Sequence, residues 1–207
     1  MSERTAGRLA IDVSELPALV IGPRGGLWWG MAGLILIEIV VFTGLIATYF
    51  YLKFLNPHWP PAGEPLPKIM LPTINTFVLI GSSLAIYYAD TSISERGDVR
   101  GLRIGVALSL TLGLAFLALK VLEYSQVEYF WDSHAYGSIV WTMIVFHSSH
   151  VLSVVLKSIV VLALSFKGHW TRERAQGMKI NGLYWHFVVV IWIPLYITIY
   201  LTPRIHG

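Results

Sequence analysis

Five long apolar stretches constrain this fold more than any other feature of the sequence. They run over 28–52, 70–90, 104–124, 138–166 and 183–202. A helix needs about 20 apolar residues to cross the roughly 30 Å of hydrocarbon in a bilayer. The apolar residues are continuous, whereas a half-buried strand would alternate apolar and polar residues. Because only helices and closed barrels can span lipid, we predict an all-α integral membrane protein, a bundle of five transmembrane helices.

The composition agrees with the membrane class and excludes several others. Of the 207 residues, 55% are hydrophobic and 13% are charged, whereas soluble domains carry roughly a quarter charged residues. The chain has no cysteine, which excludes disulfides, thiolate metal sites and iron–sulfur clusters. There is no basic stripe of the kind that binds nucleic acid, and neither a P-loop nor a GxSxG motif is present. The residues alone therefore indicate no catalytic set.

Lysine and arginine are distributed unevenly between the connections. Ten lie before the first stretch, in the second connection or in the fourth: Arg4, Arg8, Arg24, Arg96, Arg100, Arg103, Lys167, Arg172, Arg174 and Lys179. Only Lys53, Lys68 and Arg204 lie on the other side. Because cytoplasmic connections are the basic ones, we expect a cytoplasmic N-terminus and a C-terminus outside. Residues 1–26 would form a cytoplasmic segment without a cleaved signal peptide, and residues 27–207 a single five-helix domain.

Glu38 is an acidic residue near the expected middle of the first stretch. An ionisable group at that depth costs a few kcal/mol or more, so it is by default a functional-site hypothesis. In one interpretation Glu38 is a protonatable group in a relay or a gate. In the other it is a neutral acid that bonds a neighbouring helix and makes the packing specific. The sequence leaves both interpretations open.

The segment "FHSSHV" places His147 and His150 three residues apart, on one face of the fourth helix. The depth of His147 resembles that of Glu38, so the two are a plausible pair. A metal site would need a third ligand at that depth, and His186 is placed only three or four residues from the inner end of the fifth stretch. We therefore expect polar contacts or a proton-linked network, and no metal site.

Two lysines lie within the apolar stretches. Lys120 and Glu123 are three residues apart near the end of the third stretch, so we expect either an intrahelical ion pair or side chains that extend to the membrane surface. Lys157 is interpreted as structural or lipid-facing. Most tryptophans fall near the ends of stretches, as an interfacial aromatic belt predicts.

Taken in order, several segments carry a family resemblance. They are "WGMAGLILIEIVVFTGLIATYFY", "WPPAG", "LPTINTFVLIGSS", "TLG", "LEY", "YGSIVWTMIVFHSSHV" and "YWHFVVVIW". Together they cover nearly the whole chain after residue 26. The chain resembles subunit III of the haem–copper oxidases, the cytochrome c oxidase subunit III family, in its short five-helix bacterial form.

The resemblance implies a non-catalytic accessory subunit of a respiratory terminal oxidase in the bacterial inner membrane. Its main partner would be subunit I, where O2 is reduced to water and protons are pumped, with subunit II and other respiratory subunits nearby. Haem and copper would belong to partner subunits, and this chain would hold no metal. It would stabilise subunit I, bind phospholipid and support proton uptake or O2 access, with no nucleic-acid partner.

The resemblance also assigns expectations to single residues. Glu38 falls on the membrane-embedded glutamate that reacts with hydrophobic carbodiimides in this family. The other buried polar positions that match the family are His147, His150, Glu123 and His186. We further expect contacts with lipid or another subunit at Trp59, Lys167, His169 and Trp185.

Two positions depart from the family pattern. Val189 stands where the family usually has aspartate, and Lys120 where many members have glutamine. Without that aspartate, His186 is interpreted as a structural histidine bonded to a neighbouring helix or to subunit I. Two alternatives remain: a subunit III-like protein of nitric oxide reductase, and a free-standing proton-coupled transporter that uses Glu38 and His147.

Overall fold

The computed structural model describes residues 25–205, which form five long helices and a short C-terminal extension. The elements are α1 (Gly26–Leu55), α2 (Met70–Arg96), α3 (Val99–Tyr124), α4 (Ala135–Phe166), α5 (Gln176–Tyr196), the π-helical turn η1 (Ile197–Leu201) and α6 (Thr202–Ile205). Five spans are long and apolar enough to cross a membrane, the last one reaching Ile205. The prediction of five membrane-spanning helices is therefore confirmed. The expectations for Arg4, Arg8 and Arg24 lie outside the described residues.

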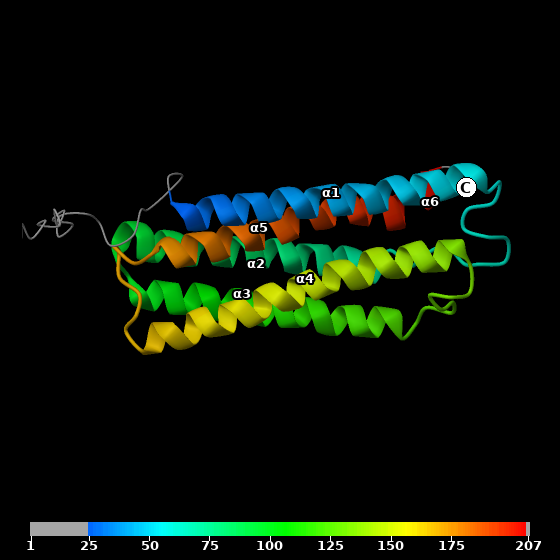
Figure 1. The fold of residues 1–207 in the computed structure, drawn as a ribbon. Helices are drawn as coiled ribbons and strands as arrows, with labels where there is room; N and C mark the ends of the chain where they lie inside the picture. Colours follow the sequence, from blue (N-terminus) through cyan, green and yellow to red (C-terminus); the bar gives the residue numbers. More distant parts are fainter. Residues whose placement is uncertain (1–24, 206–207) are drawn as a thin grey trace, which may run out of the picture.

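Successive helices run in opposite directions along one elongated bundle (Figure 1). The start of α1, the α2–α3 turn and the α4–α5 connection lie at one end, and the other two connections lie at the opposite end. An odd number of alternating spans puts the start of α1 and the end of α5 at opposite ends of the bundle. The side of the membrane that each end faces stays a prediction.

The helices extend beyond the apolar stretches from which they were predicted. The largest difference is in α5, which begins at Gln176 and not near residue 183. Hydropathy detects only the part of a helix that is apolar enough for the hydrocarbon, whereas a helix continues into polar sequence while its backbone bonds are satisfied. His186 consequently lies ten residues into α5, so the predicted position near the helix end is wrong.

The connections follow local capping chemistry. Gly97 ends α2 with a left-handed backbone (φ 66°), and the Asp98 side chain accepts a 2.9 Å bond from the Arg100 amide at the start of α3. His134 caps α4 in the same way, accepting from the Gly137 amide at 2.8 Å. The proline-rich segment 56–69 contains no helix, as its prolines predict.

Helices α2 and α3 pack closely because small residues face each other. A Cβ atom built on Gly105 would lie 2.7 Å from the carbonyl oxygen of Ala85, and one on Gly101 would lie 2.6 Å from Oγ of Ser92. At both positions a neighbouring atom would have to move, and at Gly105 that atom belongs to the backbone. Membrane helices without a strong hydrophobic drive between them associate through such close packing.

Helix α1 lies at the edge of the bundle, against α4 and α5 (Figure 1). Within Gly26–Leu55, only Phe42 and Tyr49 are buried. Most of the other apolar side chains of α1 are exposed. This surface is suited to contact with lipid or with another membrane protein.

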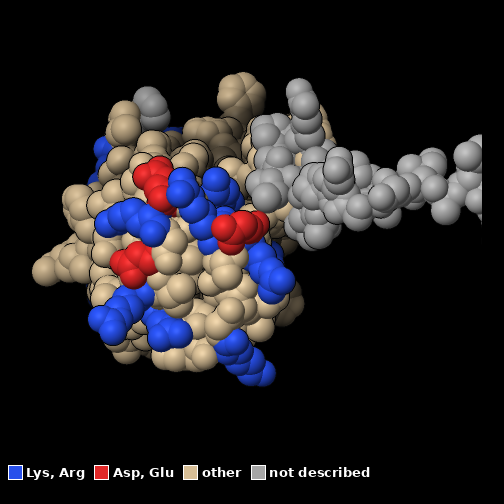
Figure 2. All heavy atoms as spheres, turned by 90° about the vertical axis from the view of Figure 1, so that its left-hand side faces the viewer, with Lys and Arg blue, Asp and Glu red and all other residues tan. Residues whose placement is uncertain are grey.

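Basic side chains gather at the end of the bundle where α1 begins (Figure 2). We call this the basic end; its cations are Arg96, Arg100, Arg103, Lys167, Arg172, Arg174 and Lys179. A smaller number of acidic side chains lies among them (Figure 2). Glu95 and Glu173 are close to these cations in the sequence and exposed. The clustering is what the predicted cytoplasmic face requires.

Candidate functional site

Glu38 lies in a polar cluster formed by three helices. Its Oε1 accepts a 2.8 Å bond from the Tyr184 hydroxyl on α5, and Nε2 of His150 on α4 lies 3.5 Å from the same oxygen. The side chains of Glu38 and His150 are each 12% exposed. Glu38 Oε2 has no hydrogen-bond partner among the described residues. We call Glu38, His150 and Tyr184, with the nearby Lys157, the Glu38 cluster.

The bond on the far side of the His150 ring sets which ring nitrogen faces Glu38. Nδ1 of His150 lies 2.7 Å from the Phe146 carbonyl oxygen, which can only accept, so Nδ1 carries a hydrogen. In the neutral ring, Nε2 then presents a lone pair to the carboxyl oxygen of Glu38. In the protonated ring, Nε2 presents an N–H to the same oxygen, 3.5 Å away.

Lys157 adds a positive charge beside this pair. Its ammonium lies 4.0 Å from the centre of the Tyr184 ring, and the Lys157 residue is exposed on α4. A cation over a tyrosine face is attracted by the ring quadrupole. The predicted structural or lipid-facing interpretation is compatible with this position.

The predicted pairing of Glu38 with His147 is wrong, because His150 occupies the position next to Glu38. His147 is fully buried, and its Nε2 donates to the Val188 carbonyl at 3.0 Å. The rings of Phe42, Phe116 and Trp192 surround it. Nδ1 of His147 has no hydrogen-bond partner among residues 25–205. His147 therefore ties α4 to the backbone of α5.

His186 belongs to a series of bonds between α2 and α5. Its Nδ1 lies 2.6 Å from Oγ of Ser83, so a neighbouring helix, one of the two predicted partners, holds it. Three further side-chain pairs connect the same helices: Trp185–Ser82 at 2.9 Å, Trp192–Thr76 at 2.8 Å and Tyr196–Thr73 at 2.5 Å. We call these four pairs the α2–α5 ladder. It explains why hydroxyls in "LPTINTFVLIGSS" accompany aromatic donors in "YWHFVVVIW".

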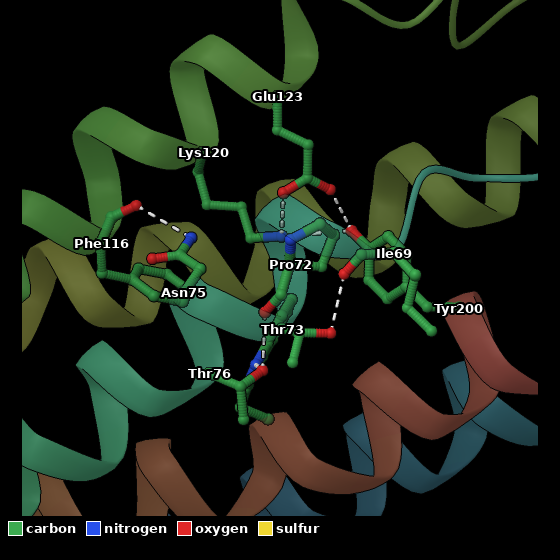
Figure 3. Close-up of polar contacts among 10 residues, drawn as sticks. Ile69, Pro72, Thr73, Asn75, Thr76, Phe116, Lys120, Glu123 and Tyr200 are labelled. Carbon is green, nitrogen blue, oxygen red and sulfur yellow. Dashed lines mark hydrogen bonds and ion pairs between the residues drawn. The ribbon is translucent and has the colours of Figure 1, made fainter.

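Lys120 and Glu123 form the second buried polar group (Figure 3). Lys120 is 1% exposed, and its ammonium lies 2.8 Å from Glu123 Oε2, so the ion-pair interpretation is confirmed and the surface-reaching one is wrong. Nζ also donates to the Tyr200 hydroxyl at 3.1 Å and lies 4.3 Å from the Trp192 ring centre. Tyr200 in turn donates to Glu123 Oε1. Thus α3 and η1 are joined around one compensated charge pair.

The four residues expected to contact lipid or another subunit divide into two kinds. Trp59 is packed against Tyr49 and Tyr136, and Trp185 is 1% exposed inside the bundle. The structure therefore gives their predicted external contacts no support. Lys167 and His169 are exposed at the basic end, where the predicted contacts are sterically possible.

Sequence reasoning missed the tyrosines that complete both clusters. Tyr184 and Tyr200 lie within an apolar stretch of the sequence, although tyrosine carries a hydroxyl that normally finds a partner when buried. The hydroxyls of Ser82 and Ser83 were missed for the same reason. The hydroxyl residues of α2 and the aromatic residues of α5 follow a matching spacing along their helices, and this match is the signal that would have indicated the ladder. Within residues 25–205, no three His, Asp or Glu side chains lie close enough to share a metal ion.

Comparison with known proteins places these features in a family context. The chain matches the family model for cytochrome c oxidase subunit III over residues 20–203. The protein named cytochrome c oxidase subunit 3 from Thermostichus vulcanus is 34% identical over 176 residues, covering 84% of this chain and 87% of the relative. Proteins of the same name from Synechocystis and Bos taurus are 32% and 33% identical, each over 84% of this chain and over 74% and 69% of their own lengths. The family match includes all five helices.

Proposed function

We propose that this chain, which belongs to the cytochrome c oxidase subunit III family, is a non-catalytic accessory subunit of a respiratory haem–copper terminal oxidase. The observation that carries the proposal is the match over residues 20–203, which takes in every membrane-spanning helix. The haem and copper centres would belong to subunit I and subunit II, and this chain would pack against subunit I. We place it in the bacterial inner membrane with the basic end in the cytoplasm.

Three features of the molecule support the physical roles that we propose. The exposed apolar surface of α1 is suited to cover a face of subunit I or to hold phospholipid against it. The Glu38 cluster places a carboxyl group 3.5 Å from an imidazole and 2.8 Å from a tyrosine hydroxyl within the helix bundle, which fits a role in sustaining proton uptake by subunit I. The α2–α5 ladder, which includes His186, holds α2 against α5 and fits a role as a structural support for subunit I.

A test of the proposal is affinity purification of this chain from native membranes, followed by optical spectroscopy. The purified complex is expected to show a Soret band and to contain a haem–copper subunit I. After detergent separation, the isolated chain is expected to show no Soret band. A haem that stays with the lone chain would overturn the proposal.

The same preparation separates the alternatives. Co-purification of nitric oxide reductase in place of an oxidase would assign the chain to that enzyme. A chain that purifies without a haem-containing partner and drives proton-coupled uptake in liposomes would be a transporter. Either result contradicts the oxidase assignment.

A further inference from the structure

A cavity of about 370 Å³ lies at the end of the bundle opposite the basic end. The beginning of α2, the end of α3, the first turns of α4 and the turn η1 surround it, and the loops 65–68 and 126–129 contribute to its lining. We call it the loop-end cavity. Its volume is in the range of small-molecule sites, roughly 300–1,000 Å³. Helix α1 contributes no residue to its lining.

Apolar side chains form most of the cavity wall. They come from three helical elements and one loop: Leu66, Met70, Ile74, Val140, Ile144 and Ile199. An apolar space left without contents forfeits dispersion contacts on every side. The cavity lies where α2 begins and α3 ends, which is the depth at which lipid chains meet their head-groups. An acyl chain is the apolar group that the surroundings supply there.

Opposite charges accompany the cavity on its two loops. Lys68 and Glu128 line it, both are exposed, and neither takes part in an ion pair within residues 25–205. The third charged residue of the lining, Glu123, is already bound by Lys120 and Tyr200. Burial raises the pKa of Tyr129, another lining residue, to about 12, so its hydroxyl stays neutral. One cation and one anion are therefore free to bind a ligand.

The shape and the charges together limit the occupant. A transmembrane helix is about 10–12 Å across with its side chains, which is too wide for a cavity of 370 Å³. A free phosphate ion would leave the apolar wall and Glu128 unused. An anionic phospholipid would meet Lys68 but be repelled by Glu128. An amine-headed phospholipid matches all three features: its acyl chain fits the apolar wall, its phosphate meets Lys68 and its ammonium meets Glu128.

We propose that the loop-end cavity binds one acyl chain of a zwitterionic, amine-headed phospholipid, with the phosphate at Lys68 and the ammonium at Glu128. This deepens the lipid-binding part of the proposed function by naming a site and a lipid class. The site is separate from α1 and from the Glu38 cluster.

The first test fills the cavity. Ile144→Trp places an indole where the acyl chain would lie, and Leu156→Trp makes the same change on an exposed face of the same helix. Native mass spectrometry of the purified complex after mild delipidation counts bound phosphatidylethanolamine. The parent and Leu156→Trp complexes are expected to retain one such lipid more than the Ile144→Trp complex. Equal retention in all three would overturn the proposal.

The second test changes only the exposed charges and so leaves the packing intact. Complexes are exchanged into nanodiscs with equal amounts of phosphatidylethanolamine and phosphatidylglycerol. Glu128→Gln is expected to lower the preference for the amine head-group by about tenfold, since one lost charge contact of ~1.4 kcal/mol is a tenfold effect. Lys68→Glu is expected to lower retention of both lipids, and the double exchange Lys68→Glu with Glu128→Lys to restore retention of phosphatidylethanolamine. An unchanged preference in Glu128→Gln would contradict the assignment.

The outcomes separate this proposal from the accessory-subunit proposal. The haem spectrum of each preparation shows whether an oxidase partner is present, and lipid retention is counted on the same sample. A preparation without haem that still retains the lipid would reject the oxidase assignment and keep the site. A haem-containing complex that retains no lipid at the cavity would reject the lipid site and keep the oxidase assignment.

Discussion

At the scale of single residues, the chemistry of this protein is concentrated in two groups of ionisable side chains inside the bundle, one around Glu38 and one around Lys120. His150 donates through Nδ1 to the Phe146 carbonyl, which leaves Nε2 facing the carboxyl group of Glu38. The charges of Lys120 and Glu123 compensate each other, and Lys120 also donates a hydrogen bond to the Tyr200 hydroxyl. Both groups obey the rule that buried charge is paired. They differ in that Glu38 keeps one oxygen without a bond among the described residues.

Glu38→Gln tests whether the ionisable carboxyl group of Glu38 matters for function. The amide has the shape of a protonated acid and can keep the Tyr184 bond, so we expect the complex to assemble normally. We expect sustained oxidase turnover to fall by less than about tenfold, or ~1.4 kcal/mol, and carbodiimide labelling of this chain to be lost. Tyr51→Phe, a change on the exposed surface of the same helix, should alter neither quantity. Failure to assemble would show that Glu38 is structural.

Glu123→Gln tests the buried charge pair. It leaves the Lys120 ammonium buried without a carboxylate, and breaking a buried pair on one side costs about 3–5 kcal/mol. We expect a marked fall in the thermal unfolding midpoint of the purified protein in detergent. The double variant Lys120→Met with Glu123→Gln should recover much of that loss, and Glu95→Gln at the exposed end of α2 should have no effect. Equal losses in the single and double variants would count against charge compensation.

Sequence reasoning identified these residues but paired them incompletely. The apolar background around Glu38, His147 and Lys120 made each one conspicuous. Two histidines three residues apart share one face, and only the neighbouring helices decide which of them meets Glu38. That decision depends on the rotation and depth of α4 against α1, which hydropathy does not contain. The Lys120–Glu123 pair was predictable because both partners lie on one helix.

At the scale of helices, two contacts fix the bundle: the α2–α5 ladder and the close approach of α2 and α3. Both depend on small or hydroxyl-bearing residues of α2. The ladder uses Ser82, Ser83 and two threonines, and the close approach uses Ala85 and Ala89. Helix α2 is thus held on two faces, by hydrogen bonds to α5 and by close packing on α3.

A double-mutant cycle measures one rung of the ladder. Ser83→Ala and His186→Asn should each destabilise the purified protein, and the coupling between them should be about 0.6 kcal/mol, the average for hydrogen bonds between membrane helices. Unfolding in detergent provides the four free energies. Coupling indistinguishable from zero would mean that the Ser83–His186 bond contributes nothing. His186 would then be held by its packing alone.

Gly105→Ala tests the α2–α3 contact. The added methyl would meet the Ala85 carbonyl oxygen at 2.7 Å, and overpacking of this kind typically costs about 1–3 kcal/mol. We expect a lower unfolding midpoint in the same detergent assay. Gly81→Ala is the matched control in α2, since its methyl would meet only Leu112 Cδ1 at 3.6 Å, an ordinary contact. Gly→Ala inside a helix otherwise raises helix propensity, so a loss in Gly105→Ala alone would report the close approach, and similar losses in both variants would contradict it.

The helices themselves were largely predictable, and their ends were not. Each apolar stretch became one helix because lipid leaves no other way to satisfy the backbone. The start of α5 was misplaced because residues 176–182 include Gln176, Lys179 and Asn181, which lower the hydropathy without breaking the helix. The ladder was not predicted, since it requires knowing that α5 packs on α2.

At the scale of the whole molecule, the charge distribution and the exposed surface of α1 determine how the bundle sits among its partners. Cations collect at the basic end, and the loop-end cavity with Lys68 and Glu128 lies at the other. Within residues 25–205, helix α1 leaves many apolar side chains exposed, including Leu36, Ile37 and Val40. A molecule of this kind is completed by its surroundings, by lipid on some faces and by a larger subunit on others.

The orientation of the bundle can be measured without removing any native cysteine, because the chain has none. Glu173→Cys introduces a thiol at the basic end, and Asp132→Cys introduces one in the connection between α3 and α4 at the opposite end; both positions are exposed. If cytoplasmic connections are the basic ones, a membrane-impermeant maleimide added to intact spheroplasts will label Asp132→Cys, and will label Glu173→Cys only after the membrane is permeabilised. The parent chain is the control for background labelling. Labelling of Glu173→Cys alone in intact spheroplasts would show that the bundle has the opposite orientation. The lipid head-group at the loop-end cavity would then lie in the cytoplasmic leaflet.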